Sequence, residues 1–221
     1  MSAVLIKTKT AGPEGRRIPT SEYSPIVLTI GHSTRTLDEF IGLLQAHTVT
    51  CVVDVRTVPR SRHNPQFNKA SLPLALKKAG LGYVHLPELG GLRHARPDSL
   101  NMGWRNNSFR GYADYMQTPE FGQGLEELIR LAKQDRVAMM CAEAVPWRCH
   151  RSLIADALMV HGVRVEDIMS PTRRQVHTLT LFAKVSGTTI TYPAENSRST
   201  QKKLAPKRLA RFAVQRVEAQ R

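Results

Sequence analysis

The chain has 221 residues, of which 41% are apolar and 23% are charged, and its formal net charge is +14. This length fits one domain with a sizeable core plus tails, and the composition is that of a soluble globular protein. No apolar run approaches the roughly eighteen residues of a membrane helix, and the N-terminus lacks the apolar segment of a secretory signal. Three unevenly spaced cysteines do not form a disulfide framework, so we expect a cytoplasmic protein without a membrane partner.

The excess of basic residues is the strongest global feature of the chain. It predicts an anionic partner, and DNA or RNA is the first candidate. Residues 195–221 contain eight Lys or Arg and two Glu. Such a C-terminal tail is either a solvated end, partly helical or disordered, or a basic arm that binds phosphates.

Strand and helix patterns alternate along most of the chain. Residues 1–25 show no periodicity, so we predict a flexible N-terminal segment there. Beyond it, apolar runs and helical periodicities predict strands at residues 26–30, 51–55, 83–85, 137–140 and 163–169, and helices at 36–46, 68–80, 109–116, from 118 onward, and 149–162. This alternation predicts a single three-layer α/β domain at residues 26–170 with a mostly parallel sheet. Residues 171–194 are expected to add strands, at about 176–182 and 188–192, that pack on the core.

Three polar residues stand where helix N-caps are expected. Thr36 with Glu39 three residues later forms a capping box. Asn68 is a candidate cap for the second helix. Thr118 precedes a proline at the first helical position of the fourth helix.

Polar side chains follow the ends of four predicted strands. They are His32 and Ser33, Asp54 and Arg56, His85, and Cys141 and Glu143. Because the carboxyl ends of parallel strands gather at one edge of a sheet, we expect these groups to lie in one cleft. The segment at residues 87–107 has no periodicity and is expected to form a flap over it.

Residues 137–159 combine a buried strand, a polar loop and an amphipathic helix. This order is typical of ligand sites in α/β domains. Within eleven residues it concentrates Cys141, Glu143, Cys149, His150 and Arg151.

Five blocks of sequence carry a resemblance to a known family. They read GHSTRTLDEFIGLLQ, VVDVRTVPRSRHNPQFN, GYVHLPELGG, FRGYADYM and CAEAVPWRCHRSLIADAL. In content and spacing they resemble the domain of unknown function 488 family, over about residues 30–168. The resemblance implies a compact α/β domain of prokaryotic type and no particular reaction. It also implies that the family pattern includes His32, Ser33, Asp54, Arg56, Pro59, Ser61, Tyr83, Gly90, Gly91, Tyr112, Cys141, Glu143, Cys149, His150 and Arg151.

Acid–base catalysis by Glu143 and His150, assisted by Asp54, is the preferred chemistry. A carboxylate and an imidazole can divide the general base and general acid roles near neutral pH. Arg56 and Arg151 would bind an anionic group, since the arginine fork contacts two oxygens at once. The protein would then be a hydrolase or transferase for a phosphate-bearing substrate such as a nucleotide or nucleic acid. The structural alternative is an ion pair between Glu143 and Arg151 that fixes the loop.

Further candidates for substrate binding lie near the predicted strand ends. They are His32, Ser33, Arg60, Ser61, Tyr83, His85 and Tyr112. The aromatic side chains could stack on a base, although such residues are more often wall packing. No cofactor is strongly indicated, and its identity, if there is one, is left open by the sequence.

A cysteine-dependent phosphatase or sulfurtransferase is a second hypothesis. Cys149 lies near a helix N-terminus beside Arg148, His150 and Arg151, whose positive charges would lower its pKa. Cys141, at the end of an apolar strand, is expected to be buried and inert. The loop between the two cysteines lacks glycine and contains a carboxylate, which disfavours a phosphate cradle.

Two further hypotheses about the function remain open. The chain could be a non-catalytic nucleic-acid-binding protein that uses its basic loops and tail. A zinc deaminase is a weaker match, because Pro146 is followed by Trp147 rather than by cysteine and only two thiols are available. We therefore predict no metal ligands.

Overall fold

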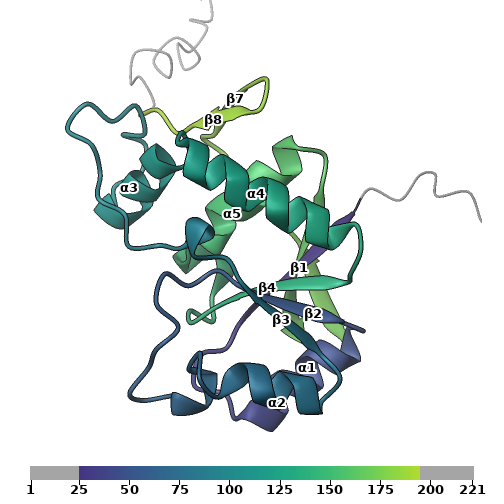
Figure 1. Ribbon diagram of the computed structural model, residues 1–221. Coiled ribbons are helices and arrows are strands. Elements are labelled where there is room, and N and C mark those ends of the chain that lie inside the picture. Colours follow the sequence, from purple (N-terminus) through teal and green to yellow (C-terminus); the bar gives the residue numbers. More distant parts are fainter. Residues whose placement is uncertain (1–24, 195–221) are drawn as a thin grey trace, which may run out of the picture.

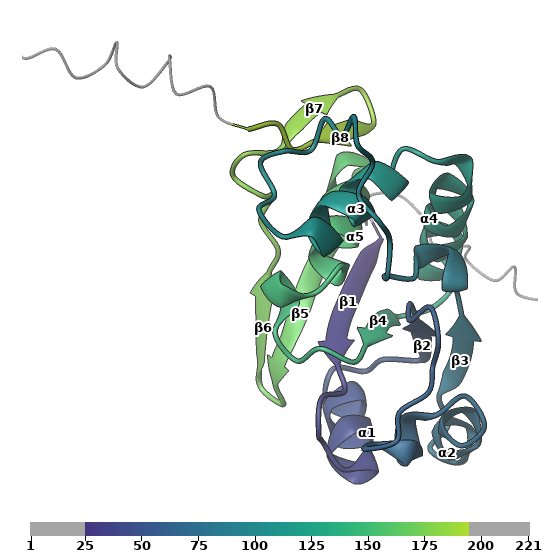
Figure 2. The same cartoon turned by 90° about the vertical axis from the view of Figure 1, so that its left-hand side faces the viewer.

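The computed structural model describes residues 25–194, which form a six-stranded sheet between two layers of helices (Figure 1). The strand order is β3-β2-β4-β1-β5-β6, as Figure 2 shows from the side. The strands are β1 (Ile26–Gly31), β2 (Cys51–Asp54), β3 (Gly82–His85), β4 (Val137–Cys141), β5 (Arg164–Ser170) and β6 (Arg173–Val176). Strands β1 to β5 pair in parallel, and β6 joins the edge antiparallel to β5. The predicted α/β class and mostly parallel sheet are confirmed.

Helices cover both faces of the sheet. Helices α1 (Leu37–Ala46) and α2 (Leu72–Lys78) lie on one face. Helices α4 (Pro119–Ala132) and α5 (Arg151–Val160) cover the other face, with α3 (Asn107–Tyr115) beyond them. This arrangement is the three-layer fold that the alternating pattern predicted.

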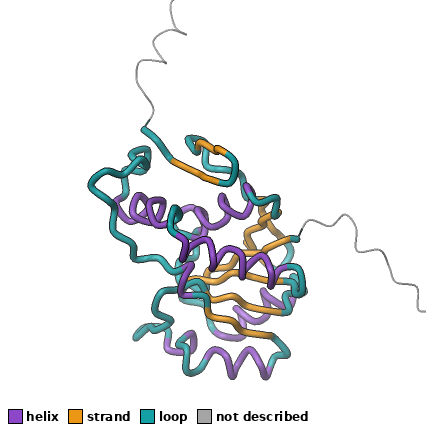
Figure 3. Tube along the Cα trace, turned by 45° about the horizontal axis from the view of Figure 1, so that its top comes forward, coloured by secondary structure: helices purple, strands orange, loops and turns teal. Residues whose placement is uncertain are grey.

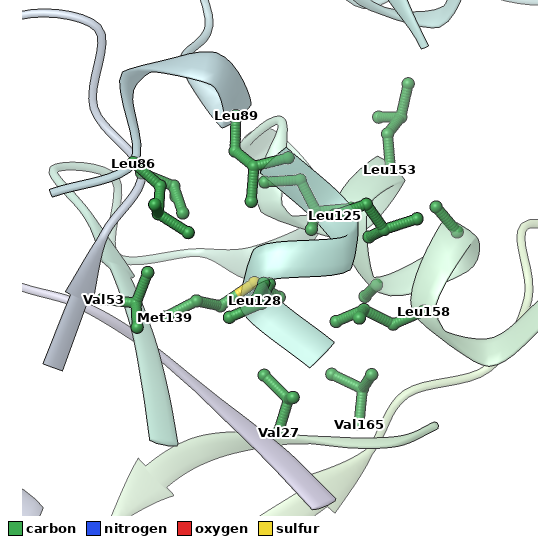
Figure 4. Packing of buried hydrophobic residues seen from close by; sticks show 14 of the residues in the cluster. Val27, Val53, Leu86, Leu89, Leu125, Leu128, Met139, Leu153, Leu158 and Val165 are labelled. Atoms are coloured by element: carbon green, nitrogen blue, oxygen red, sulfur yellow. The ribbon is translucent and has the colours of Figure 1, made fainter. Parts of the chain in front are cut away.

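Successive residues along the strands belong alternately to two separate hydrophobic clusters, one on each face of the sheet. On β1, Val27 belongs to the cluster under α4 and α5, whereas Leu28 belongs to the cluster under α1 and α2. Figure 4 shows part of the first cluster, which combines strand residues such as Met139 with Leu125 of α4 and Leu158 of α5. Each fully buried side chain of this kind contributes about 1.5–3 kcal/mol. On β4 the same alternation turns Cys141 toward α5, like Met139.

The structure tests the three predicted caps. Thr36 accepts from the backbone N–H of Glu39, and the Glu39 carboxylate accepts from the Thr36 N–H, so the capping box is confirmed. Thr118 caps α4 as predicted. The prediction for Asn68 is wrong, because its side chain instead accepts the backbone N–H of Ser61 at 2.6 Å and α2 begins three residues later than that cap would require.

The segment after β5 folds against the core. Strand β6 begins before the expected range, and β7 (Lys184–Ser186) pairs with β8 (Thr189–Thr191) in a separate hairpin, visible beyond the main sheet in Figure 3. Ile190 and Tyr192 are buried in the cluster under α4 and α5. Residues 1–24 and 195–221, for which we predicted a flexible segment and a basic tail, lie outside the described residues. Within residues 25–194, no helix combines the length and apolar character that crossing a membrane requires.

Candidate functional site

The site lies where the sheet topology reverses. Strands β1 and β4 are neighbours, but the helix after β1 covers one face and the helix after β4 covers the other. Ligands of open α/β sheets bind in the crevice at such a switch point. Here the backbone N–H groups of His32 and Ser33 donate to the carbonyls of Cys141 and Ala142, both at 2.9 Å, which locks the two strand ends together.

A cavity of about 650 Å³ opens at this edge. Of the fourteen site residues predicted from the sequence, ten line it: His32, Ser33, Arg56, Arg60, Ser61, Tyr112, Cys141, Glu143, Cys149 and His150. The other four, Asp54, Tyr83, His85 and Arg151, do not line it. Several lining residues were not predicted from the sequence, among them Thr57, Asn64, Leu92 and Phe109, and Arg148 was predicted only as a charge beside Cys149. The sequence did contain one signal for this part of the lining, because Gly91, the neighbour of Leu92, belongs to the family pattern.

Two thiols from different elements meet on the cavity wall. Cys141 ends β4, Cys149 immediately precedes the first turn of α5, and their Sγ atoms are 2.7 Å apart. Their side chains are 3% and 5% exposed, so access to both sulfurs is through the cavity. The contact between them could not be read from the sequence, since their separation along the chain gives no distance in space.

The two thiols are driven to opposite protonation states. Burial raises the pKa of Cys149, but the hydrogen bond from Cys141, the charge of Arg151 and the Arg151 backbone N–H outweigh it and lower the pKa to about 6. The same hydrogen bond, together with burial, raises the pKa of Cys141 well above its ordinary value. At neutral pH the pair is therefore a Cys149 thiolate that accepts from a Cys141 thiol.

His150 is held with one ring nitrogen toward the sulfur. Its Nε2–H donates to the Val55 carbonyl at 3.0 Å, and Nδ1 lies 3.6 Å from the Cys149 Sγ. Burial lowers the pKa of His150, which favours the neutral ring. Gly91 packs against this ring, and a Cβ there would lie 3.0 Å from Nδ1. The ring is therefore fixed as a neutral acceptor beside the thiol.

Arg151 lies behind the thiols and does not reach the cavity. Its side chain is 1% exposed, and its guanidinium donates to the Thr29 hydroxyl at 2.9 Å and to the Glu143 backbone carbonyl at 2.6 Å. The Thr29 hydroxyl in turn donates to Asp167 at 2.7 Å. The contact with Glu143 is through its main chain, while the Glu143 carboxylate is exposed and accepts the Val145 N–H at 3.3 Å. Arg151 thus fixes the loop and places a positive charge close to Cys149.

Asp54 is fully buried and does not line the cavity. Its carboxylate accepts two hydrogen bonds from the Arg56 guanidinium, at 2.8 and 2.6 Å, and one from the Tyr83 hydroxyl at 2.8 Å. Burial, followed by the Asp54 charge and hydrogen bond, raises the pKa of Tyr83. These contacts orient Arg56, whose remaining nitrogen donates to His32 Nε2 at 3.2 Å.

His32, which follows β1, and His85, which ends β3, both make hydrogen bonds within the scaffold. Burial lowers the pKa of His32 to about 4, and its Nδ1–H donates to the Ser33 carbonyl at 2.8 Å. Its ring stacks on Phe67 with 4.3 Å between centroids. The Nε2–H of His85 donates to the Arg56 carbonyl at 2.8 Å.

Arg60 and Arg148 bring positive charge to the cavity. Both are exposed on its lining, and within residues 25–194 neither has a carboxylate within ion-pair distance. Ser61 and Asn64 line the same cavity, and the Asn64 backbone N–H donates to the Ser61 hydroxyl at 3.0 Å. Glu143 is the acidic residue on this wall. The lining therefore favours an anionic ligand.

The thiols and His150 also offer a set of metal donors. The two Sγ atoms and a ring nitrogen of His150 all lie within 4.8 Å of one another. Such a set suits zinc or another soft metal, with an open position toward the cavity. Two thiolates on tetrahedral zinc lie about 3.8 Å apart at a Zn–S bond of about 2.3 Å, so these sulfurs, 2.7 Å apart, would have to separate to bind it.

Comparisons with known proteins identify a family and no activity. A glycogen synthase 1 from Geobacter sulfurreducens is 32% identical to this chain over 83 residues, which are 35% of the chain and 17% of that protein. The chain thus spans about a sixth of that relative's length. No solved structure matches it. The sequence profile described as domain of unknown function DUF488 matches residues 36–158, more than half of the chain. The chain belongs to the DUF488 family.

Proposed function

We propose that this protein is a cysteine-dependent enzyme, a transferase or hydrolase, in which the Cys149 thiolate attacks an anionic substrate bound in the cavity. The observation that carries the proposal is the Cys149 sulfur on the cavity wall, with its pKa lowered to about 6. A thiolate is the reactive form of cysteine, and low-pKa thiols near a cation and a helix N-terminus are typical nucleophiles.

The geometry favours this chemistry over acid–base catalysis by Glu143 and His150. Both ring nitrogens of His150 face protein atoms, one the Val55 carbonyl and the other the Cys149 sulfur. Asp54 is fully buried and engaged by Arg56 and Tyr83, so it cannot reach a substrate. In the cysteine mechanism His150 Nδ1 instead accepts the proton of Cys149 whenever the thiol is protonated.

The surroundings of Cys149 suit an anionic reactant. Arg60 and Arg148 attract the charged group, and the N-terminus of α5 contributes a partial positive charge next to the sulfur. Attack by the thiolate forms a bond from sulfur to the electrophilic atom, and the leaving group departs with the electron pair of the broken bond. Arg151, buried beside the pair, stabilises the thiolate before the attack.

Paired alkylation with iodoacetate and iodoacetamide tests the nucleophile and the anion preference together. We expect Cys149 to be alkylated at pH 7 in the folded chain, with a ratio of iodoacetate to iodoacetamide rates several-fold above that of the urea-unfolded chain. Replacing both Arg60 and Arg148 with Ala should return the ratio to the unfolded value. Arg130→Ala, on the surface of α4 and away from the cavity, is the matched control. Labelling of Cys149 that needs pH above 9, or a ratio unaffected by the double substitution, would contradict the proposal.

The net charge of +14 favours a second, compatible proposal, that the substrate or a partner is a nucleic acid. Binding through phosphates weakens steeply with salt. A salt series with labelled single- and double-stranded oligonucleotides would compare the full chain with one that ends at Ala194. Loss of binding in the shortened chain would assign nucleic-acid binding to residues 195–221. Retained binding would assign it to the remaining residues, which include the cavity. Absence of binding by both at moderate salt would exclude this second proposal.

A further inference from the structure

In a reaction that uses a single nucleophile, Cys141 would only form a hydrogen bond with Cys149 and would not react with the substrate. Its sulfur nevertheless lines the same cavity and lies 2.7 Å from the nucleophile. We propose that Cys141 is a second catalytic thiol that resolves a covalent adduct on Cys149, and that the substrate therefore contains a sulfur–sulfur bond next to an anionic group. This inference rests on the Cys149 nucleophile of the proposed function. It names the substrate class of the same site and makes thiol–disulfide exchange the overall reaction, in place of hydrolysis or transfer to a second substrate.

The position of Cys141 suits attack on an adduct of Cys149. An adduct carried by the Cys149 sulfur extends into the cavity, because the opposite side is closed by Arg151 and by the first turn of α5. Cys141 lies at the end of β4 beside this bond, and its sulfur needs to approach by only about 0.7 Å to reach the 2.05 Å of a disulfide. No other thiol competes, since Cys51 is buried at the start of β2, on the edge of the sheet away from the cavity.

The protonation states give the two thiols their order. Cys149, which lies just before the N-terminus of α5 and has the lowered pKa, attacks first, while the hydrogen bond between the two sulfurs raises the pKa of Cys141 and favours its thiol form. Once Cys149 is bonded to substrate, it no longer carries the negative charge that held the proton on Cys141. The charge of Arg151 then favours a Cys141 thiolate, which is the state needed for the second attack.

Atoms and electrons balance over two exchanges. The Cys149 thiolate attacks a disulfide R–S–S–R′, forms Cys149–S–S–R and releases R′–S⁻. Cys141 then loses its proton, attacks the Cys149 sulfur and releases R–SH, which leaves a Cys141–Cys149 disulfide. The protein loses two electrons and the substrate gains two, and a small dithiol reductant returns the pair to the starting state by the reverse exchange.

A phosphate ester fits this site less well than a disulfide does. Arg151 is not placed to clamp a phosphate on the sulfur, because it does not line the cavity and its two Nη atoms already donate to the Thr29 hydroxyl and to the Glu143 backbone carbonyl. Displacement at phosphorus also gives a second thiol nothing to attack, whereas a Cys149 mixed disulfide presents it with a sulfur atom.

Titration of the reduced full chain with dithiobis-nitrobenzoate, an aromatic disulfide with a carboxylate on each ring, tests the inference at pH 7. For each Cys149 that reacts, we expect two coloured thionitrobenzoates to be released and a Cys141–Cys149 disulfide to appear in the peptide map. Cys141→Ser should release one and keep a stable mixed disulfide on Cys149. Cys51→Ser should behave like the unchanged chain, because the pKa of Cys51 is raised to about 11 by burial.

The outcomes separate this inference from the proposed function. Release of one thionitrobenzoate from the unchanged chain, with a lasting adduct on Cys149, would overturn the role of Cys141 and leave the nucleophile in place. No reaction at Cys149 in the folded chain, with full reaction after unfolding, would overturn both. The stoichiometry of the unchanged chain gives this answer even where Cys141→Ser fails to fold.

Discussion

At the scale of single residues, Cys141 and Cys149 have the same side chain and opposite protonation states. Each sulfur accepts one backbone N–H, Cys149 from Arg151 at 3.5 Å and Cys141 from Glu143 at 3.4 Å. The difference comes from the hydrogen bond between the sulfurs, which lowers the pKa of Cys149 and raises that of Cys141, and the charge of Arg151 lowers the pKa of Cys149 further. Because the two sulfurs share one proton, their apparent pKa values describe the pair and not either cysteine alone. The reactivity of Cys149 therefore depends on Arg151, a residue that no ligand in the cavity touches.

Replacing Arg151 tests this dependence. Arg151→Gln removes the charge that lowers the pKa of Cys149, so we expect that pKa to rise by about one unit or more and alkylation at pH 7 to fall several-fold. Arg148→Gln is the control, because Arg148 is the neighbouring exposed arginine on the cavity lining and should leave the pKa of Cys149 nearly unchanged. Equal effects of the two substitutions would show that the buried charge has no special role. Rates of iodoacetamide labelling as a function of pH make the comparison.

The sequence predicted a low pKa for Cys149 but only part of its cause. It assigned the effect to positive charges on Arg148, His150 and Arg151. In the structure Arg151 contributes, while burial lowers the pKa of His150 and favours its neutral form. The hydrogen bond from Cys141 could not be predicted, because it depends on how β4 and α5 pack. Burial of Cys141 was predicted and is confirmed at 3% exposure.

At the scale of elements, the junction of β1 with the loop after β4 determines the shape of the site. Gly31 ends β1 directly against that loop, and a Cβ at this position would overlap the Glu143 carbonyl oxygen. The same carbonyl accepts from Arg151. A side chain at residue 31 would therefore displace the loop and disturb both thiols.

Gly31→Ala is expected to destabilise the fold and to lower the reactivity of Cys149. Overpacking of a closely packed backbone site costs about 1–3 kcal/mol or more. Gly42→Ala on α1 is the matched control, since nothing lies within 4 Å of a Cβ there and helical Gly→Ala is stabilising by about 0.5–1 kcal/mol. Urea unfolding and the alkylation rate of Cys149 give the two readouts. A Gly31→Ala protein as stable and as reactive as the control would contradict a close contact at this junction.

The elements themselves were largely predictable, because their signals are local. Apolar runs at β1, β2 and β4 and the caps at Thr36 and Thr118 depend on residues within one element. Asn68 was misjudged for a long-range reason: its side chain holds the backbone of Ser61 in a loop that the local pattern does not describe. Gathering of polar groups at strand ends followed from parallel pairing alone. The sequence could not show which of them face the cavity, so the burial of Asp54 under Arg56 was not foreseen.

At the scale of the whole molecule, the segment after β5 is tied to the core by buried polar contacts. Asp156 on α5 is fully buried and accepts from the Tyr192 hydroxyl at 2.9 Å and from His177 Nε2 at 2.9 Å. Tyr192 is itself completely buried. These contacts join the last described residues to the helix that begins at the thiol pair.

Tyr192→Phe is expected to lower the free energy of unfolding by about 1–3 kcal/mol, because one oxygen of a buried carboxylate loses its partner. Tyr115→Phe is the control, since the Tyr115 hydroxyl donates to the Glu88 carbonyl at a more exposed site and its loss should cost less. Urea unfolding of both variants measures the difference. Equal costs would indicate that the Asp156 contact does not contribute to the packing of this segment.

The pH dependence of Cys149 alkylation is the most direct test of the account, because the proposed chemistry requires a thiolate at neutral pH. Iodoacetamide rates would be measured from about pH 5 to 10 in the reduced full chain, with each cysteine quantified by peptide mass spectrometry. Since deprotonation increases with pH and the pKa of Cys149 is lowered to about 6, its rate should reach half of its maximum near pH 6 and be nearly constant above about pH 7. Cys51, with its pKa raised to about 11, should stay almost unreactive over the same range. A Cys149 midpoint near 9, the ordinary value, would contradict the account.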